Sequence, residues 1–373
     1  MNLRNLPTRE FDYVMAAAAL LLVAYGALLI YSASLNTYGA PEALSHPVAR
    51  QVAFAVVGVL AMVLLSRVDY RLLGPLSLAL YVASLAGLVY VMLVGENEYG
   101  SRRWVEVAGT QVQPSEMAKA CTVILLAKFF SDNEENMGSP RVFAISVAIA
   151  AIPAGLVLQQ PDLGSAVVFG VIWLGMAIIA RVRMLHLAAL FAVAAVVAPL
   201  LWFMAAHDFQ RARIDIWRDP ESDPLGRGFN ILQAEISSGS GRLFGKGLTH
   251  GTQTQLDYLR TQSTDYIFSV GAEELGFVGI MVLFGLYMVL LYRCLRVAGR
   301  ADDAFGRLMA VGVVSFILFQ VFVNIGVNIR LVPVTGVPLP LLSQGGSSLI
   351  TVLASLGILQ SVLGHRRKRG RRV

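Results

Sequence analysis

Apolar stretches of roughly 20 residues recur along the whole sequence, each about as long as a helix that crosses the hydrocarbon core of a bilayer. Hydrophobic residues make up 56% of the chain and charged residues 14%, a balance that excludes an ordinary soluble globular protein. The pattern predicts an all-α polytopic membrane protein, a single domain over 1–373 with about ten transmembrane helices. We expect these helices at 13–34, 48–66, 72–94, 115–130, 142–158, 163–180, 184–206, 265–292, 308–330 and 341–364.

Basic residues gather in alternate connections between these stretches, and Lys and Arg accumulate in short cytoplasmic loops. This distribution predicts that both termini are cytoplasmic. The basic tail, 365–373, directly follows the last stretch and is typical of a topology anchor on an anionic membrane surface. Nucleic-acid binding is the competing interpretation of the tail, and its place beside a transmembrane segment disfavours it.

The chain lacks the motifs of several common cofactors. No Walker-type glycine loop is present, so we expect no nucleotide cofactor. Cys121 and Cys294 neighbour neither another cysteine nor a histidine at metal-ligand spacing. This spacing indicates neither a disulfide framework nor a zinc site.

One long polar segment, about 207–264, interrupts the apolar pattern, and the count of stretches places it outside the cell. Connections this long are usually functional or disordered. Aromatic residues such as Trp217, Phe229 and Tyr258 favour packing against the helices over disorder. Its second half also contains glycines that indicate tight turns and close backbone approach, namely Gly239, Gly241, Gly245, Gly247 and Gly251.

Asp265 lies where this polar segment gives way to the eighth apolar stretch. An ionisable side chain at a water–membrane boundary costs free energy unless a partner, a cation or a reaction compensates it, so it is a functional candidate. The competing interpretation is a solvated carboxylate at a helix start, where the helix dipole favours a negative charge.

Other polar residues lie at the predicted outer ends of the stretches. Arg102 and Arg103 oppose the usual charge distribution and could either hold a phosphate or anchor the chain at the interface. Glu116 and Lys119 share a helix face and favour a structural ion pair inside the bundle. Asp162, in a very short turn, favours a helix cap.

Taken in order, these fragments resemble the SEDS family (shape, elongation, division and sporulation) over essentially the whole chain. The resemblance rests on motifs at 102–104, 113–116, 160–164, 245–247, 251–256, 264–268, 273–276, 338–340 and 343–347, of which Thr264-Asp265-Tyr266-Ile267-Phe268 and Ser343-Gln344-Gly345-Gly346-Ser347 are examples. The run Thr254-Gln255-Leu256-Asp257-Tyr258-Leu259 resembles the elongation branch more than the division branch.

The resemblance implies a peptidoglycan glycosyltransferase of the bacterial cytoplasmic membrane that polymerises lipid II at the outer face. Conversion of the α-linked lipid sugar into a β-1,4 bond implies a single inverting step, with Asp265 as general base on the acceptor hydroxyl. Arg102, Arg103 or Lys246 would stabilise charge on the diphosphate, with a divalent cation, Mg²⁺ or Mn²⁺, as an additional helper. The matching motifs also assign Gln253, Ser343 and Gln344 to substrate binding.

The implied partners are a class B penicillin-binding protein that crosslinks the strands, undecaprenyl-diphosphate-linked glycan, and other proteins of the elongation complex. Two rival functions remain open from the residues. One is a flippase that transports lipid II, although the sequence shows no convincing internal repeat of the kind that transporters carry. The other is a non-catalytic scaffold of the cell-wall synthesis complex.

Overall fold

The computed structural model describes residues 10–38, 46–98, 101–107, 110–205, 208–223, 226–259 and 261–365. Each of the ten predicted stretches corresponds to one long helix in this part of the chain. The helices are α1 (Tyr13–Tyr38), α2 (Pro47–Arg67), α3 (Leu73–Val94), α4 (Pro114–Asp132), α5 (Pro140–Gln159), α6 (Leu163–Ile179), α7 (Met184–Ala205), α11 (Ile267–Arg300), α12 (Ala304–Asn328) and α13 (Gly346–Gly364). Position 206 and the basic tail beyond His365 lie outside the described residues.

Length and composition distinguish three kinds of helix in the described chain. Seven helices are long and apolar enough to cross a membrane: α1, α2, α3 together with the short helix η2 (Tyr70–Leu72), α5, α11, α12 and α13. Helix α6 and the first part of α7 are shorter apolar helices. Helix α4 carries charged residues at 116, 119, 128 and 132, which explains its weaker apolar signal.

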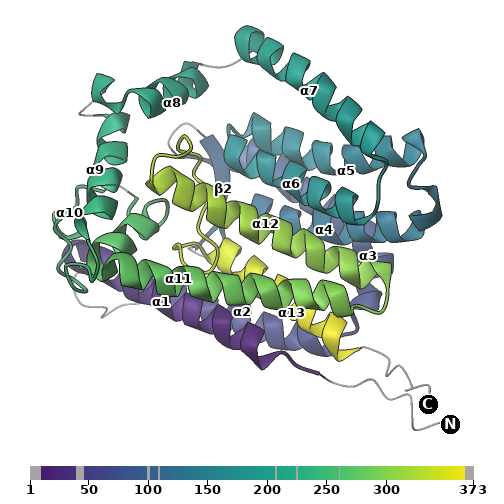
Figure 1. The fold of residues 1–373 in the computed structure, drawn as a ribbon, viewed down its shortest axis with the longest axis horizontal. Helices are drawn as coiled ribbons and strands as arrows, with labels where there is room; N and C mark the ends of the chain where they lie inside the picture. Colours follow the sequence, from purple (N-terminus) through teal and green to yellow (C-terminus); the bar gives the residue numbers. More distant parts are fainter. Residues whose placement is uncertain are drawn as a thin grey trace.

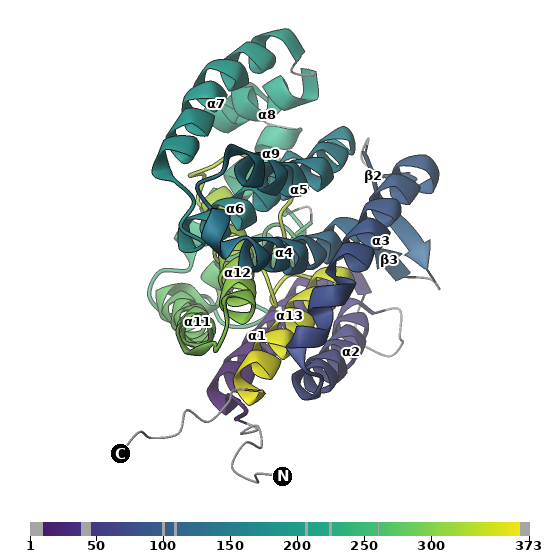
Figure 2. The same cartoon turned by 90° about the vertical axis from the view of Figure 1, so that its right-hand side faces the viewer.

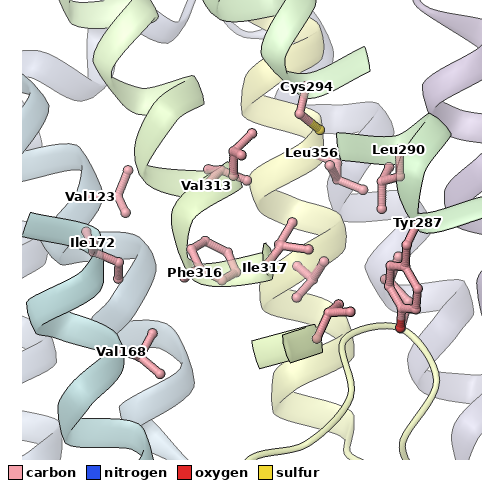
Figure 3. Close-up of a cluster of buried hydrophobic side chains, with 14 of the residues drawn as sticks. Val123, Val168, Ile172, Tyr287, Leu290, Cys294, Val313, Phe316, Ile317 and Leu356 are labelled. Atoms are coloured by element: carbon pink, nitrogen blue, oxygen red, sulfur yellow. The ribbon is translucent and has the colours of Figure 1, made fainter. Parts of the chain in front are cut away.

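Helices α12 and α13 form the interior of the bundle, and most of their residues are buried. Figure 3 shows Phe316 and Ile317 of α12 between Ile172 of α6 on one side and Leu356 of α13 on the other. All four side chains belong to one buried hydrophobic cluster. Burial of such side chains holds the central helices together, and the peripheral helices present apolar residues outward, as helices in contact with lipid do.

A small antiparallel sheet between α3 and α4 was not predicted. It consists of β1 (Glu96–Glu98), β2 (Ser101–Val107) and β3 (Thr110–Val112), in the order β1-β2-β3. Arg102 pairs with Asn97 in the backbone register of β1 and β2, while the Arg102 side chain lies outside the described part of the structure. The sheet carries the neighbouring Arg103 toward the α5–α6 turn.

The segment between α7 and α11 is folded where it is described. It contains α8 (Asp208–Arg218), η4 (Pro220–Ser222), α9 (Arg227–Ser240) and α10 (Thr252–Gln255). Figure 1 shows α9 and α10 beside the start of α11, whereas α7 and α8 extend away from the other helices. Figure 2 shows α7 and α8 on one side of the bundle and α1, α2 and α13 on the opposite side.

Helix α11 is kinked at Gly276, whose φ of 65° lies in the left-handed region that glycine adopts without strain. The chain that follows α9 supplies hydrogen-bond partners at the kink. The N–H groups of Phe277 and Val278 donate to the carbonyls of Arg242 and Leu243 at 2.8 and 3.0 Å. These bonds replace the helical bonds that the kink removes, so the loop and α11 form one structural unit.

Candidate functional site

The backbone of Asp265 is held by α12 and by its own loop. The Asp265 carbonyl accepts hydrogen bonds from the side-chain amides of Asn324 and Asn328 at 3.2 and 2.9 Å. Its N–H donates to the Thr261 carbonyl at 3.1 Å. Asn328 also accepts from the N–H and hydroxyl of Ser269, in the first turn of α11. The start of α11 is therefore fixed against the end of α12.

The segment between α12 and α13 supports the other side of the Asp265 loop. The Ser343 hydroxyl donates to the Thr264 carbonyl at 2.6 Å and accepts from the Leu339 N–H at 2.9 Å. The Gln344 N–H donates to the Ser263 carbonyl at 2.9 Å. Ser343 and Gln344 thus position the peptide before Asp265, and their predicted contact with substrate stays a prediction.

Asp265 as a whole residue is half-buried, and among the described residues no hydrogen bond or ion pair reaches its carboxylate oxygens. Burial raises the pKa of Asp265 to about 6. The positive charges of Arg103 and Arg213 lower this pKa, and the negative charge of Asp162 raises it. A carboxylate with this pKa is ionised at neutral pH and is a stronger base than an ordinary aspartate. The arrangement can accept a proton from a bound hydroxyl.

Arg103 connects β2 to the turn between α5 and α6. Its guanidinium donates to the carbonyls of Gln160 and Pro161 at 3.2 and 2.6 Å and lies 3.5 Å from the Asp162 carboxylate. Asp162 accepts from the Ser165 N–H at 3.0 Å, so the predicted helix cap is confirmed. Asp162 has a second role that the sequence did not reveal, because it orients an arginine whose charge acts on Asp265.

Arg213, on α8, belongs to the group Arg211, Arg213, Asp215 and Arg218, which the sequence alone favours as a solvated charged face and does not connect with Asp265. The charge of Arg213 lowers the pKa of Asp265, so the segment between α7 and α11 contributes a cation to the same region as Arg103. The available signal was the run of Arg211, Arg213 and Arg218 on one short helix. Such a run is usually a solvated charged face, and only the fold identifies which of its members approaches Asp265.

The predicted pairing of Glu116 and Lys119 is confirmed. Their charged atoms lie 2.7 Å apart in the first two turns of α4, and the side chains are 2% and 1% exposed. The negative member lies nearer the N-terminus of the helix, where the helix dipole favours it. The pair is therefore a buried element of the bundle near the N-terminal end of α4.

Lys246 and Gln253 meet at Glu273, a buried residue of α11. The Lys246 ammonium donates to Glu273 at 2.7 Å and to the Thr252 hydroxyl at 2.7 Å. Glu273 also accepts from the Gln253 N–H at 3.0 Å and from the N–H and hydroxyl of Thr254 at 3.2 and 3.1 Å. Glu273 lies about 12 Å along the helix from Asp265. Lys246 thus anchors the loop between α9 and α11, and its contact with a diphosphate stays a prediction.

A divalent cation would take only part of its coordination from the described residues. The described part of the chain contains no group of three or more His, Cys, Asp or Glu side chains that could hold one. Mg²⁺ often binds through one or two carboxylates and completes its coordination with water and substrate phosphates. Asp265, whose carboxylate has no hydrogen-bond or ion-pair partner among the described residues, fits that limited protein contribution, and the divalent cation stays a prediction.

Comparison with known proteins decides the family. Residues 12–368 match the family model described as cell cycle protein, FtsW/RodA/SpoVE. The chain belongs to the FtsW/RodA/SpoVE family. It is 38% identical over 358 residues to peptidoglycan glycosyltransferase MrdB of Escherichia coli K12, covering 96% of this chain and 95% of that protein. It is 36% identical to stage V sporulation protein E of Bacillus subtilis, covering 95% of this chain and 98% of that protein.

Solved structures support the same family assignment. A chain from a peptidoglycan synthase complex that coordinates polymerization and crosslinking superposes with a TM-score of 0.77 at 32% identity, covering 95% of this chain and 97% of that chain. The rod shape determining protein RodA of Thermus thermophilus gives a TM-score of 0.68 at 31% identity with the same coverage. The family resemblance seen in the sequence is confirmed, and so is the helical fold.

Proposed function

We propose that this chain is a peptidoglycan glycosyltransferase that polymerises lipid II into β-1,4-linked glycan strands during cell elongation. The observation that carries the proposal is the half-buried residue Asp265. Its backbone is fixed by α12 and by the α12–α13 segment, and its pKa is raised to about 6. Relatives across the family that match almost the whole chain are named peptidoglycan glycosyltransferases.

In the proposed reaction, Asp265 accepts the proton of the acceptor hydroxyl as its oxygen attacks the anomeric carbon of the lipid-linked sugar. The bond to the diphosphate breaks on the opposite face, which inverts the α-linkage into a β-linkage. The developing negative charge remains on the lipid diphosphate. Arg103 and Arg213 are the described cations whose charges lower the pKa of Asp265, so they are placed to stabilise the charge on the diphosphate. Arg102 or a divalent cation would stabilise that charge further.

The proposal includes a transpeptidase partner and a location. A structural neighbour belongs to a complex that coordinates polymerization and crosslinking. We propose that this chain likewise works with a class B penicillin-binding protein, within a larger elongation complex. The apolar helices support a multi-pass protein of the bacterial inner membrane, with both termini cytoplasmic and Asp265 at the outer face.

Reconstitution with lipid II tests this function against its rivals. The purified chain and its transpeptidase partner, with the transpeptidase blocked by a penicillin, should convert labelled lipid II into glycan strands that a muramidase digests. Movement of lipid II across the vesicle membrane without strand formation would support a flippase. Strand formation that depends only on an added synthase would support a scaffold.

A further inference from the structure

A cavity of about 560 Å³ lies at the end of the bundle opposite to Asp265. It is bounded by the end of α4, the short helix η3 (Glu134–Asn136), the turn after α6 and the beginning of α12. These elements meet where apolar helices end and polar connections begin. In a membrane protein this boundary corresponds to the level of the lipid headgroups.

Charges of both signs surround the mouth of the cavity. Glu134 and Glu135 belong to η3, Arg181 follows α6, and Arg307 lies on α12. All four side chains are exposed, and within the described residues none of them takes part in an ion pair. The mouth thus offers two cations and two anions that are available to a ligand.

The backbone of Arg181 makes its position unusual. Its φ of 61° lies in the left-handed region that usually belongs to glycine after a helix, where an L-residue is strained. Arg330 occupies a similar conformation after α12, where its guanidinium donates to the carbonyls of Trp217 and Arg218. Arg330 thus combines a strained backbone with hydrogen bonds from its guanidinium. Arg181 has a similarly strained backbone, and its side chain lines the cavity.

Part of the cavity lining is apolar. Phe130, Met137 and Leu308 line it and are almost fully buried. Ile178 and Ile179 line it as well, and each is 46% exposed on the last turn of α6. The apolar lining therefore continues from the interior to the outer surface of a helix end. A ligand with a charged head and hydrocarbon chains matches this continuity better than a soluble peptide does.

We propose that this cavity binds a zwitterionic phospholipid whose headgroup carries a primary ammonium. Arg181 and Arg307 bind its phosphate, and Glu134 and Glu135 bind its ammonium through charge-assisted hydrogen bonds. The acyl chains run along the exposed residues of α6. Glu134 and Glu135 supply acceptors for an ammonium, which a purely anionic headgroup lacks. This site is separate from Asp265 and does not depend on glycosyl transfer.

Lipid retention measured by native mass spectrometry tests the phosphate contacts. The full-length protein is prepared in nanodiscs of phosphatidylethanolamine and phosphatidylglycerol, and the lipids that remain after activation are counted. R181Q/R307Q should lower the affinity of the retained phosphatidylethanolamine by about tenfold, the effect of losing roughly 1.4 kcal/mol. R300Q removes an exposed arginine from the same end of the bundle but outside the cavity, and it should retain the lipid. Equal retention by R181Q/R307Q and R300Q would refute the site.

The carboxylates are tested by headgroup preference. The unaltered protein should prefer phosphatidylethanolamine over phosphatidylcholine, whose methylated ammonium cannot donate, and over phosphatidylglycerol, which has no ammonium. E134Q/E135Q should remove this preference while retaining a lipid and an unchanged Tm. A preference for phosphatidylglycerol, or a preference that E134Q/E135Q leaves intact, would contradict the proposal. So would displacement of the lipid by soluble glycerophosphoethanolamine at equal concentration, because the site would then recognise a free headgroup.

Discussion

Asp265 combines a fixed backbone with a carboxylate that forms no hydrogen bond or ion pair with any described side chain. Two asparagines of α12 and one serine of the α12–α13 segment hold the peptide in place. The charge is stabilised only from a distance, by Arg103 and Arg213. This combination suits a general base, because the group must be aligned with its substrate and still be free to accept a proton.

Sequence reasoning identifies the residues whose roles depend on local spacing. Glu116 and Lys119 are three residues apart, and Asp162 immediately precedes α6, so pairing and capping follow from helix geometry. The asparagines that hold Asp265 lie 59 and 63 residues further along the chain. No local pattern indicates such contacts, and they become visible only when α11 and α12 are placed side by side.

The pH dependence of polymerisation should report the raised pKa of Asp265. Burial raises this pKa to about 6, so the carboxylate is protonated below that pH and ionised above it. Because only the ionised form is a base, kcat/KM should rise with pH through about 6 and then level off. Arg213→Gln removes a charge that lowers the pKa, so it should move the inflection to higher pH, whereas the control Arg218→Gln should not. An inflection near pH 4 in the unaltered enzyme would contradict the effect of burial.

The contribution of the Glu116–Lys119 ion pair to stability can be measured by exchanging the two charges. Glu116→Gln or Lys119→Met alone strands a buried charge, which typically costs about 3–5 kcal/mol. The double exchange, Glu116→Lys with Lys119→Glu, should recover part of the thermal stability. Recovery should be incomplete, since the lysine would then lie nearer the positive end of the helix dipole. Equal Tm values for the single variants and the parent protein would show that the pair is not needed for stability.

At the scale of elements, helix α11 and the segment that precedes it, between α7 and α11, depend on each other. Gly276 interrupts α11, and residues of the segment bind at the break. Gly241 packs so closely that a Cβ atom there would lie 1.9 Å from the Ala272 carbonyl oxygen. The sequence predicts an ordered segment from its aromatic residues and glycines. It does not predict the kink, because the Glu-Glu-Leu-Gly run lies within an otherwise regular apolar helix, nor the sheet, because β1 and β3 are only three residues long.

Substitution of Glu273 should disrupt the segment between α7 and α11 more than substitution of its partner Lys246. Glu273→Ala removes the acceptor shared by Lys246, Gln253 and Thr254, so the segment should become sensitive to protease and polymerisation should be lost. Lys246→Ala leaves Glu273 with its remaining donors and should have a milder effect on protease sensitivity. Limited proteolysis and polymerisation are measured on the same preparations. Loss of polymerisation by Lys246→Ala with an intact segment would instead support direct binding of the diphosphate.

At the scale of the whole molecule, the bundle keeps its two ends chemically distinct. One end assembles Asp265, Arg103 and Arg213 from the loop before α11, from β2 and from α8. The other end contains the charged cavity between α4, α6 and α12. The helices themselves were predictable because each apolar stretch has the length of a membrane span. Their packing, which brings parts of the site together from distant segments, was not.

The central claim is that Asp265 is the catalytic base, and Asp265→Asn tests it most directly because it keeps the shape and removes the basicity. Polymerisation of lipid II by the purified variant with its partner should fall by about 10²–10⁴-fold. The protein should remain folded: since burial raises the pKa of Asp265, the ionised carboxylate disfavours the folded state above the ordinary aspartate pKa. The variant should therefore show an equal or higher Tm at neutral pH. Polymerisation at a near-normal rate by the folded variant would contradict the account.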